Sequence, residues 1–224
     1  GTATEDQVLT ATVTDEDGSS GTITYAWKRA GSAISGATSS TYTLVQADVG
    51  SAITVSVSFT DDYSNGETAT SDATSAVANV NDAGSGLSLA SDGDVADPDE
   101  DDVLSISGTL ADEDGVSGAS PTYVWSTGAT SSTLTLGQTD VGTTISVVIS
   151  YTDDQSESNT ITLTAASDVD NVNDTPSITS SGTVTGTEDA AYSYSITTTD
   201  EDGSSLDSWT ITCTTCPSWL SISH

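Results

Sequence analysis

The chain repeats a set of short motifs in the same order, with a spacing of about 90 residues. Each copy has a Glu-Asp pair, then Asp-Glu-Asp-Gly, then Tyr-x-Trp, and it ends with Asn-Val-Asn-Asp. A third copy begins at residue 187 and then diverges. The matching segments of the first two copies are 5–9 and 100–104, 15–18 and 112–115, 25–27 and 123–125, 36–41 and 128–133, 46–50 and 138–142, 59–62 and 151–154, and 79–82 and 171–174. This period is too long for a solenoid unit, so it predicts a tandem array of small domains.

The predicted domains are residues 1–83, 84–175 and 176–224. A strand-like run at 177–185 precedes the third Glu-Asp pair, whereas only residues 1–4 precede the first. We therefore expect the first repeat to lack its first strand and the third to be the N-terminal half of a domain. The Gly/Ser/Asp stretch 83–98 is interpreted as a long linker. The whole chain is then expected to be a slice of a longer, elongated array.

Apolar residues alternate with polar ones in several short runs, including 53–59, 133–136, 161–163 and 192–196. A period of two with β-branched residues is typical of half-buried strands. About seven such strands in each repeat predict an all-β fold of immunoglobulin-like β-sandwiches. Trp27 and Trp125 lie at matching positions, and we expect core anchors there rather than ligand-binding aromatics. The segment 46–50 is expected to form a single helical turn.

The formal net charge is −32, from 34 acidic and two basic residues. Lys28 and Arg29 alone cannot neutralise phosphates, so nucleic-acid binding and binding to anionic membranes are excluded. No apolar run approaches the ~20 residues of a membrane-spanning helix, and no signal segment opens the sequence. The sequence has no Ser-His-Asp set or phosphate-binding loop, and its paired carboxylates lie in polar loops rather than in apolar pockets. We therefore expect that the protein is not an enzyme.

The carboxylates are grouped at the ends of the predicted strands. Each complete repeat has four groups, which in the first repeat are Glu5 with Asp6, Asp15 with Asp17, Asp61 with Asp62, and the exit segment 79–82. Ca²⁺ prefers carboxylate, carbonyl and amide oxygens, whereas Zn²⁺ prefers His and Cys. Asp-Gly pairs also form ordinary turns without a metal, but a merely solvated surface would not repeat four groups at matching positions. The pattern therefore predicts Ca²⁺ binding, with neutral oxygens from Asn79, Asn81, Asn171 and Asn173.

Two resemblances follow from these motifs. The Glu-Asp entry, the Asp-x-Asp-Gly loop and the Asn-x-Asn-Asp exit resemble cadherin-like repeats. The stretch from Tyr25 to Gly50 resembles the immunoglobulin-like repeats of very large bacterial surface proteins, including biofilm-associated and calcium-dependent adhesins. This likeness covers about residues 4–175. The third unit, through 191–194 and 217–221, resembles the first half of a dystroglycan-type cadherin-like domain.

The resemblance implies an extracellular, cell-surface array whose domain junctions are stiffened by Ca²⁺. At one junction the implied ligands are Asn79, Asn81, Asp82, Glu100, Asp101, Asp112 and Asp114. At the next junction they are Asn171, Asn173, Asp174, Glu188, Asp189, Asp200 and Asp202. Neighbouring loops would complete the two shells through Asp61, Asp62, Asp153 and Asp154. The insertion at 83–98 departs from the pattern and is expected to loosen the first junction or to change its ligands.

Each of three smaller motifs has two possible interpretations. Asp92, Asp94, Asp97 and Asp99 form either an additional ion site or a solvated spacer. Cys213 and Cys216 form a C-x-x-C, which we read as a small structural disulfide rather than a redox site, because it lacks a thioredoxin-like βαβ context. Asn173-Asp174-Thr175 fits a glycosylation sequon, although calcium binding would compete for the same residues.

Three functions are compatible with the sequence. The first is a Ca²⁺-stiffened spacer of an extracellular adhesin, whose partners are the neighbouring repeats of the same polypeptide. The second is a subunit of an extracellular filament, sheath or surface layer built by self-association. The third and weakest is a carbohydrate-binding module that stacks sugars on exposed Trp or Tyr. The adhesive target cannot be read from spacer repeats.

Overall fold

The computed structural model describes residues 3–181, 187, 189–190, 194 and 196–203. The chain divides into two compact units. One unit contains the residues up to 87 together with 108–122 and 149–161, and the other contains 88–107, 123–148 and the described residues from 162 onward. The domain boundaries expected from the sequence stay predictions.

The all-β fold class is confirmed, because paired antiparallel strands make up the regular structure of the described residues apart from two short 3₁₀ turns. The strands of the first repeat are β1 (Val8–Thr10), β2 (Thr24–Arg29), β3 (Ser32–Ala33), β4 (Thr41–Thr43), β5 (Ile53–Thr60) and β6 (Gly66–Thr70). Those that follow are β7 (Ser85–Ser91), β8 (Val103–Ala111), β9 (Thr122–Trp125), β10 (Thr133–Thr135), β11 (Thr144–Thr152), β12 (Ser158–Asp168), β13 (Ser177–Ile178) and β14 (Thr198–Thr199). The 3₁₀ turns are η1 (Gln46–Asp48) and η2 (Gln138–Asp140), so the helical turn expected at 46–50 is confirmed.

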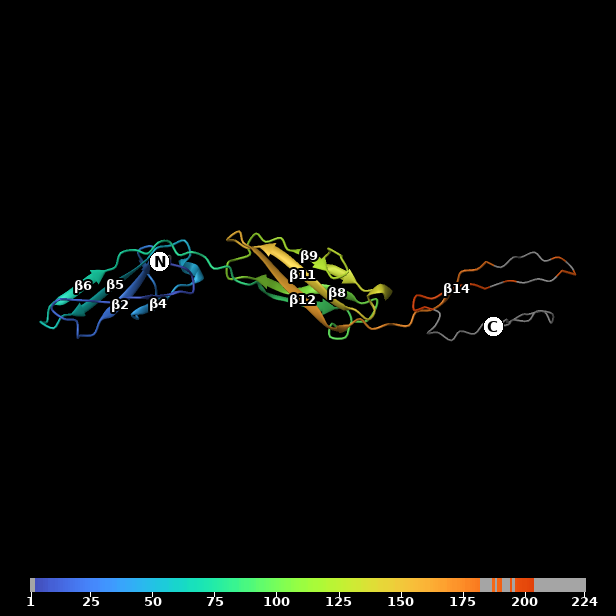
Figure 1. Cartoon of the computed structure of the whole chain (residues 1–224), viewed down its shortest axis with the longest axis horizontal. Helices are drawn as coiled ribbons and strands as arrows, with labels where there is room; N and C mark the ends of the chain where they lie inside the picture. The colour runs from blue at the N-terminus through green and yellow to red at the C-terminus, as the bar shows by residue number, and fades with distance from the viewer. Residues whose placement is uncertain (1–2, 182–186, 188, 191–193, 195, 204–224) are drawn as a thin grey trace. The chain divides into compact units, whose positions relative to one another are not determined.

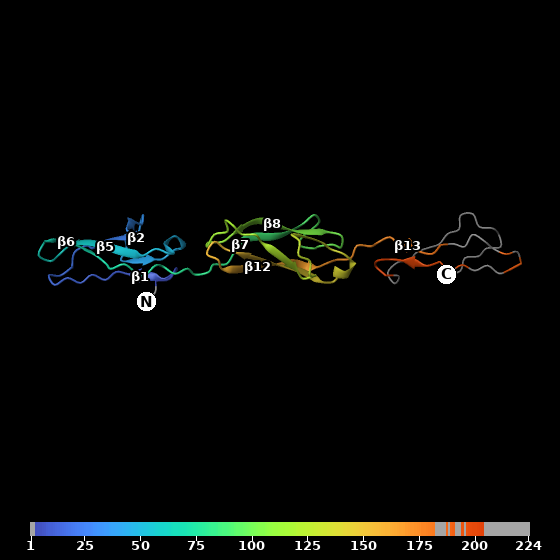
Figure 2. The same cartoon turned by 90° about the horizontal axis from the view of Figure 1, so that it is seen from above.

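The first repeat is a two-sheet sandwich. One sheet pairs β1 with β4, and the other has the order β3-β2-β5-β6. Figure 2 shows β1 in a separate layer from β2, β5 and β6, which also lie side by side in Figure 1. The alternating pattern of β5 places Ile53, Val55 and Val57 in the core between the sheets. Trp27 packs with them at 3% exposure, and its indole N–H donates to the Ser39 carbonyl at 2.9 Å.

The second repeat also has two sheets, but it has β7 as an extra strand and, among its described residues, no counterpart of β3. Its sheets have the orders β10-β8-β7 and β12-β11-β9. Val103 lies opposite Thr135 in the pairing of β8 with β10, just as Val8 lies opposite Thr43 in the pairing of β1 with β4. Trp125 is 1% exposed, so both tryptophans are core anchors, as the sequence predicted.

The segment 83–98 is not a linker throughout, which corrects the sequence interpretation. Strand β7 occupies Ser85–Ser91 of this segment and pairs with β8. Its Leu87 and Leu89 alternate with small polar residues and are half-buried, whereas Gly86 and Ser88 are exposed. The abundance of Gly and Ser hid this alternation, because these residues usually indicate loops.

Short parallel bridges join the entry of each complete repeat to its exit. Thr4 pairs in parallel with Ala78, and Asp99 pairs in parallel with Asp170. The Glu5 N–H donates to the Ala78 carbonyl at 3.0 Å, and the Glu100 N–H donates to the Asp170 carbonyl at 2.9 Å. The next residue of each repeat is an aspartate with a left-handed backbone, with φ of 63° at Asp6 and 70° at Asp101. These bridges place each entry glutamate beside the exit segment of its own repeat.

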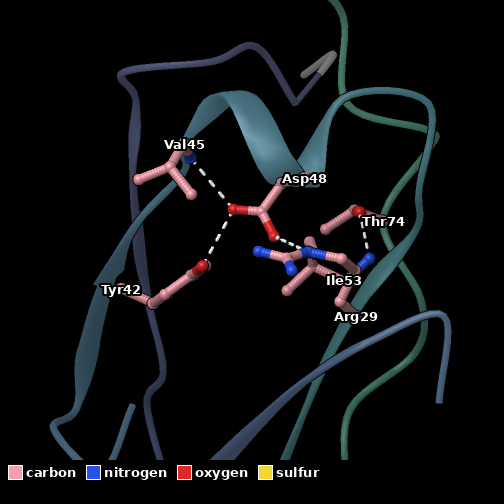
Figure 3. A network of polar contacts seen from close by, with 6 residues as sticks. All are labelled: Arg29, Tyr42, Val45, Asp48, Ile53 and Thr74. Atoms are coloured by element: carbon pink, nitrogen blue, oxygen red, sulfur yellow. Dashed lines mark hydrogen bonds and ion pairs between the residues drawn. The ribbon is translucent and has the colours of Figure 1, made fainter. Parts of the chain in front are cut away.

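A buried polar network joins η1 to strands β2 and β4 in the first sandwich (Figure 3). Asp48 at the end of η1 is fully buried and accepts three hydrogen bonds, from Arg29 Nε at 2.7 Å, from the Tyr42 hydroxyl at 2.8 Å and from the Val45 N–H at 2.9 Å. The hydrogen bond that Arg29 donates to Asp48 raises the pKa of Arg29, whose side chain is 30% exposed. The second repeat has Asp140 at the matching position, but Thr127 and Leu134 replace Arg29 and Tyr42.

Candidate metal centres

Three carboxylates from two successive sequence repeats meet in the first compact unit. Glu5 lies at the entry of the first repeat, Asp82 at its exit, and Asp114 in the Asp-Glu-Asp-Gly loop of the second repeat. One oxygen of each lies within 4.8 Å of the others. Glu5 and Asp114 are each 3% exposed, and Asp82 is half-buried. Three negative charges so close together repel one another unless a proton or a cation compensates for them.

A second cluster has the same three residue types at the matching positions of the next repeat. Glu100, Asp174 and Asp202 hold the matching positions one repeat further along the chain, and their oxygens also lie within 4.8 Å of one another. Glu100 is 4% exposed, and the two aspartates are half-buried. All three members belong to the second compact unit.

Each cluster leaves one buried carboxylate oxygen without a hydrogen-bond donor. The Asp82 N–H donates to Asp114 Oδ2 at 2.9 Å, and the Asp174 N–H donates to Asp202 Oδ2 at 2.6 Å. In both loop aspartates the other oxygen, Oδ1, is buried and has no partner. An unpaired charged oxygen away from water is costly, so its recurrence at matching positions indicates a ligand for it.

The same physical causes raise the pKa of matching acids in the two clusters. Burial raises the pKa of Glu5, and the charges of Asp82 and Asp114 raise it further. Burial raises the pKa of Asp82 as well, and among the neighbouring charges that of Asp114 raises it most. Burial likewise raises the pKa of Glu100, and among the neighbouring charges that of Asp174 raises it most. Burial also raises the pKa of Asp174, to which the charge of Asp202 adds most. Both clusters therefore favour binding of a positive species.

These shifts predict an unusual pH dependence for the calcium-free chain. A group whose folded pKa is raised stabilises the fold below its unfolded pKa, and this contribution is lost as pH rises through the folded pKa. Above the ordinary pKa values of 3.8 for aspartate and 4.5 for glutamate, the four acids with raised pKa lower stability as they ionise. Thermal melts in chelator are expected to give a higher melting temperature at about pH 5 than at about pH 7. Saturating Ca²⁺ should abolish or reverse this trend, and a chelated chain that is less stable at the lower pH would contradict it.

The Asp-Glu-Asp-Gly loop positions its last aspartate in the same way in all three copies. The side chain of its first aspartate accepts the N–H of the last, in the pairs Asp15 with Asp17 at 2.9 Å, Asp112 with Asp114 at 2.9 Å and Asp200 with Asp202 at 3.0 Å. Tyr151 donates to the other oxygen of Asp112. Asp17 is exposed and joins neither cluster, so the loop sequence alone does not make a cluster.

Four predicted ligands accept hydrogen bonds from other protein groups, two of them within turns. Asp61 is 6% exposed and accepts bonds from the Tyr63 and Asn65 N–H groups and from the Asn65 amide, which lowers its pKa. Asp153 makes the matching bonds to Gln155, Glu157 and Asn159. Asp62 accepts from Ser20, and Asp154 accepts from Ser117. Neither cluster includes any of the four.

The remaining predicted ligands lie around the clusters or outside the described residues. Asp6 and Asp101 add negative charge near Glu5 and Glu100. Asn79 Oδ1 is buried without a partner, and so is Asp200 Oδ2. Asn81 pairs with Asn159, and Asn173 donates to the Asp174 carbonyl. Asn171 and Asp189 are exposed. Glu188, Cys213 and Cys216 lie outside the described residues, so their predicted roles stay predictions.

The structure groups the entry glutamates differently from the grouping that the resemblance implied. Glu100 was assigned to the junction with Asp82 and Asp114, but it joins Asp174 and Asp202, and Glu5 takes its place in the first cluster. The physical reason is the parallel bridge at each entry, which holds the glutamate beside the exit of its own repeat.

One supporting residue was missed by the sequence analysis. With its amide nitrogen facing the carboxylate, Gln138 donates to both oxygens of Glu100 at 2.8 and 2.9 Å. Gln46 occupies the matching position in the first repeat, and its Oε1 is buried without a partner. The recurrence of Gln in the motif Gln-x-Asp-Val-Gly of both repeats could have indicated this supporting role.

No family model and no curated protein matches the chain. Among solved structures, it is similar to a Ca²⁺-stabilized adhesin that helps an Antarctic bacterium reach out and bind ice, at 15% identity over 71% of this chain and with a TM-score of 0.29. The chain spans 43% of the length of that adhesin structure. It is also similar to the amphioxus IgVJ-C2 molecule, at 8% identity over 73% of this chain and 96% of that one, with a TM-score of 0.30. At such TM-scores neither likeness bears on function.

The described residues contain no helix long and apolar enough to cross a membrane.

Proposed function

We propose that the chain binds Ca²⁺ at the two three-carboxylate clusters and that it acts as a calcium-stiffened spacer of an extracellular adhesin. One observation carries the calcium proposal: the same three acids recur in two places, each with a buried carboxylate oxygen that has no donor. The clusters offer only oxygen ligands, which favours Ca²⁺ over Zn²⁺. Asp112, Asn79 and main-chain carbonyls lie close enough in sequence to complete a larger oxygen shell.

The spacer role is supported by the fact that each cluster combines acids from two successive repeats. Each cluster takes two acids from one sequence repeat and one acid from the next, so a bound ion would tie successive repeats together. Millimolar calcium is an extracellular condition, and weak modules outside cells use affinities of about 10⁻⁴–10⁻³ M. A carbohydrate-binding role gains no support from Trp27 and Trp125, because both indoles are buried.

The test is a calcium titration of the chelator-treated chain, with Mg²⁺ as the control ion. Calorimetry is expected to show at least two bound ions per chain. Ligand at about 100 times the dissociation constant stabilises the native state by about 2.7 kcal/mol per site, which for a chain of this size raises the melting temperature by roughly 10–20 °C for two sites. An unchanged melting temperature in excess Ca²⁺ would refute the proposal. A shift that Mg²⁺ reproduces in full would refute the assignment to Ca²⁺.

A further inference from the structure

The two complete repeats differ at one sheet edge. In the second repeat, β8 lies between β10 and β7. In the first repeat, β1 pairs with β4, and no strand among the described residues pairs with its other edge. Because β1 and β8 hold the same register against β4 and β10, the open edge of β1 corresponds to the edge of β8 that β7 covers.

The open edge changes both the length and the burial of the first strand. Strand β8 continues for nine residues, whereas β1 ends after three, although the Ala11 N–H still bonds to the Ser40 carbonyl at 2.8 Å. Leu104 is fully buried, but the matching Leu9 is only half-buried. Val8 is 57% exposed, whereas the matching Val103 is half-buried. Apolar residues that β7 helps to cover in one repeat are therefore left accessible in the other.

A groove lies along this edge. Its volume is about 490 Å³, and its sides are the segments 9–14 and 69–74. The core residues Trp27, Ile53, Val55 and Val57 form its base. The described sandwich thus has an opening to its own core, next to unpaired backbone groups.

The backbone of β1 shows which groups are free. The Leu44 N–H donates to the Gln7 carbonyl and the Ala11 N–H donates to the Ser40 carbonyl, so Gln7, Leu9 and Ala11 face β4. Alternate residues of an antiparallel strand direct their N–H and C=O groups to opposite edges. Val8, Thr10 and Thr12 therefore point their backbone groups to the open edge, which is a template for an added strand.

We propose that this edge and groove bind one further extended strand: an uncharged peptide segment of the β7 type, with leucine-sized side chains at alternate positions. Strand β7 itself, Ser-Gly-Leu-Ser-Leu-Ala-Ser, shows what the equivalent edge accepts. The negative charge of the chain also favours an uncharged segment over an acidic one. The groove is lined by neutral residues apart from Asp72, and the chain carries a net charge of −32, so an acidic strand would be repelled. The proposal does not depend on calcium.

The test is amide hydrogen exchange of the whole ¹⁵N-labelled chain in Ca²⁺, with and without a synthetic peptide of the sequence 84–91. At a peptide concentration of ten times the dissociation constant, exchange of the Val8, Thr10 and Thr12 amides is expected to slow by about tenfold. The Leu9 and Ala11 amides are the internal controls, because β4 and the segment before it already bond them. A control peptide with both leucines replaced by aspartate should have no effect. Equal protection by both peptides, or no protection at millimolar peptide, would overturn the proposal.

Two further measurements make the test specific. Thr12→Pro removes an edge N–H at a position where edge strands tolerate proline, and it should weaken peptide binding by about tenfold or more. Thr12→Val keeps the N–H and should bind the peptide as the unmodified chain does; equal weakening by both variants would contradict the edge geometry. Protection of the same three amides without peptide, rising with protein concentration, would show that a second copy fills the edge and would overturn the proposed occupant. If Thr12→Pro does not fold, the comparison of the two peptides decides.

Discussion

Asp114→Asn is expected to remove one of the two proposed calcium sites. Its effect on stability is expected to have opposite signs in saturating calcium and in chelator. The Asp82 N–H needs an acceptor, so the amide oxygen of the new side chain takes that bond and its NH₂ group faces the other two carboxylates. An NH₂ group cannot ligate Ca²⁺. The calcium-dependent rise in melting temperature should fall by about half, a loss of about 2.7 kcal/mol at a calcium concentration 100 times the dissociation constant.

Without calcium, the same substitution should leave the chain equally or more stable. It removes one of three mutually repelling charges. Burial is the main cause of the raised pKa of Glu5 and Asp82, and the charge of Asp114 raises both further. A purely structural role for Asp114 predicts destabilisation under both conditions, so the sign in chelator separates the two interpretations. Asp17→Asn is the matched control, because Asp17 holds the same loop position and is exposed. It should change neither the stoichiometry nor the calcium-dependent shift, and a loss of binding equal to that of Asp114→Asn would contradict the assignment of the site.

Asp48→Ala is expected to destabilise the first repeat by about 3 kcal/mol. Removing one partner of a buried ion pair costs about 3–5 kcal/mol, and the lower end applies because Arg29 is 30% exposed and can regain water. The substitution also leaves the Tyr42 hydroxyl and the Val45 N–H without their acceptor. Asp48→Asn keeps an acceptor but loses the charge, so it should lie between the alanine variant and the unmodified chain.

The second repeat supplies a matched comparison for this substitution. Asp140 is half-buried, and its side chain accepts one bond, from the Gly137 N–H at 3.1 Å. Asp140→Ala therefore removes little more than a turn cap, which costs about 1 kcal/mol. Urea unfolding in saturating Ca²⁺, followed by amide exchange of core residues in each repeat, measures both values. Equal costs for the two substitutions would show that the contacts of Arg29 and Tyr42 contribute nothing.

The sequence was sufficient for the fold class because the periodicity of β5 and the two core tryptophans are local signals. It was not sufficient for β7, because glycine and serine in that strand conceal the alternation of Leu87 and Leu89. The strand shows itself only through its pairing with β8, which is a contact between segments.

The site was predicted as a set of residue types, and the structure brings six of the predicted residues together in two clusters. Asp61 and Asp153 also follow strands, but backbone N–H groups of the next four residues donate to one oxygen of each. Sequence composition cannot distinguish an aspartate that closes a turn from one that faces other acids. The grouping of Glu5 with Asp82 and Asp114 depends on the bridge from Thr4 to Ala78, which no local pattern encodes.

The same parallel bridges have a mechanical consequence. In each complete repeat the bridged segments lie near the chain entry and the chain exit and run in the same direction. Tension applied directly before the entry segment and directly after the exit segment therefore pulls these segments past each other, so their hydrogen bonds are loaded in shear together. In the second repeat, β7 precedes the entry segment and would have to separate from β8 first. Resistance to extension is governed by the rate of unfolding rather than by equilibrium stability. The entry and exit of each repeat thus act as a clamp whose strength depends on the direction of the applied force.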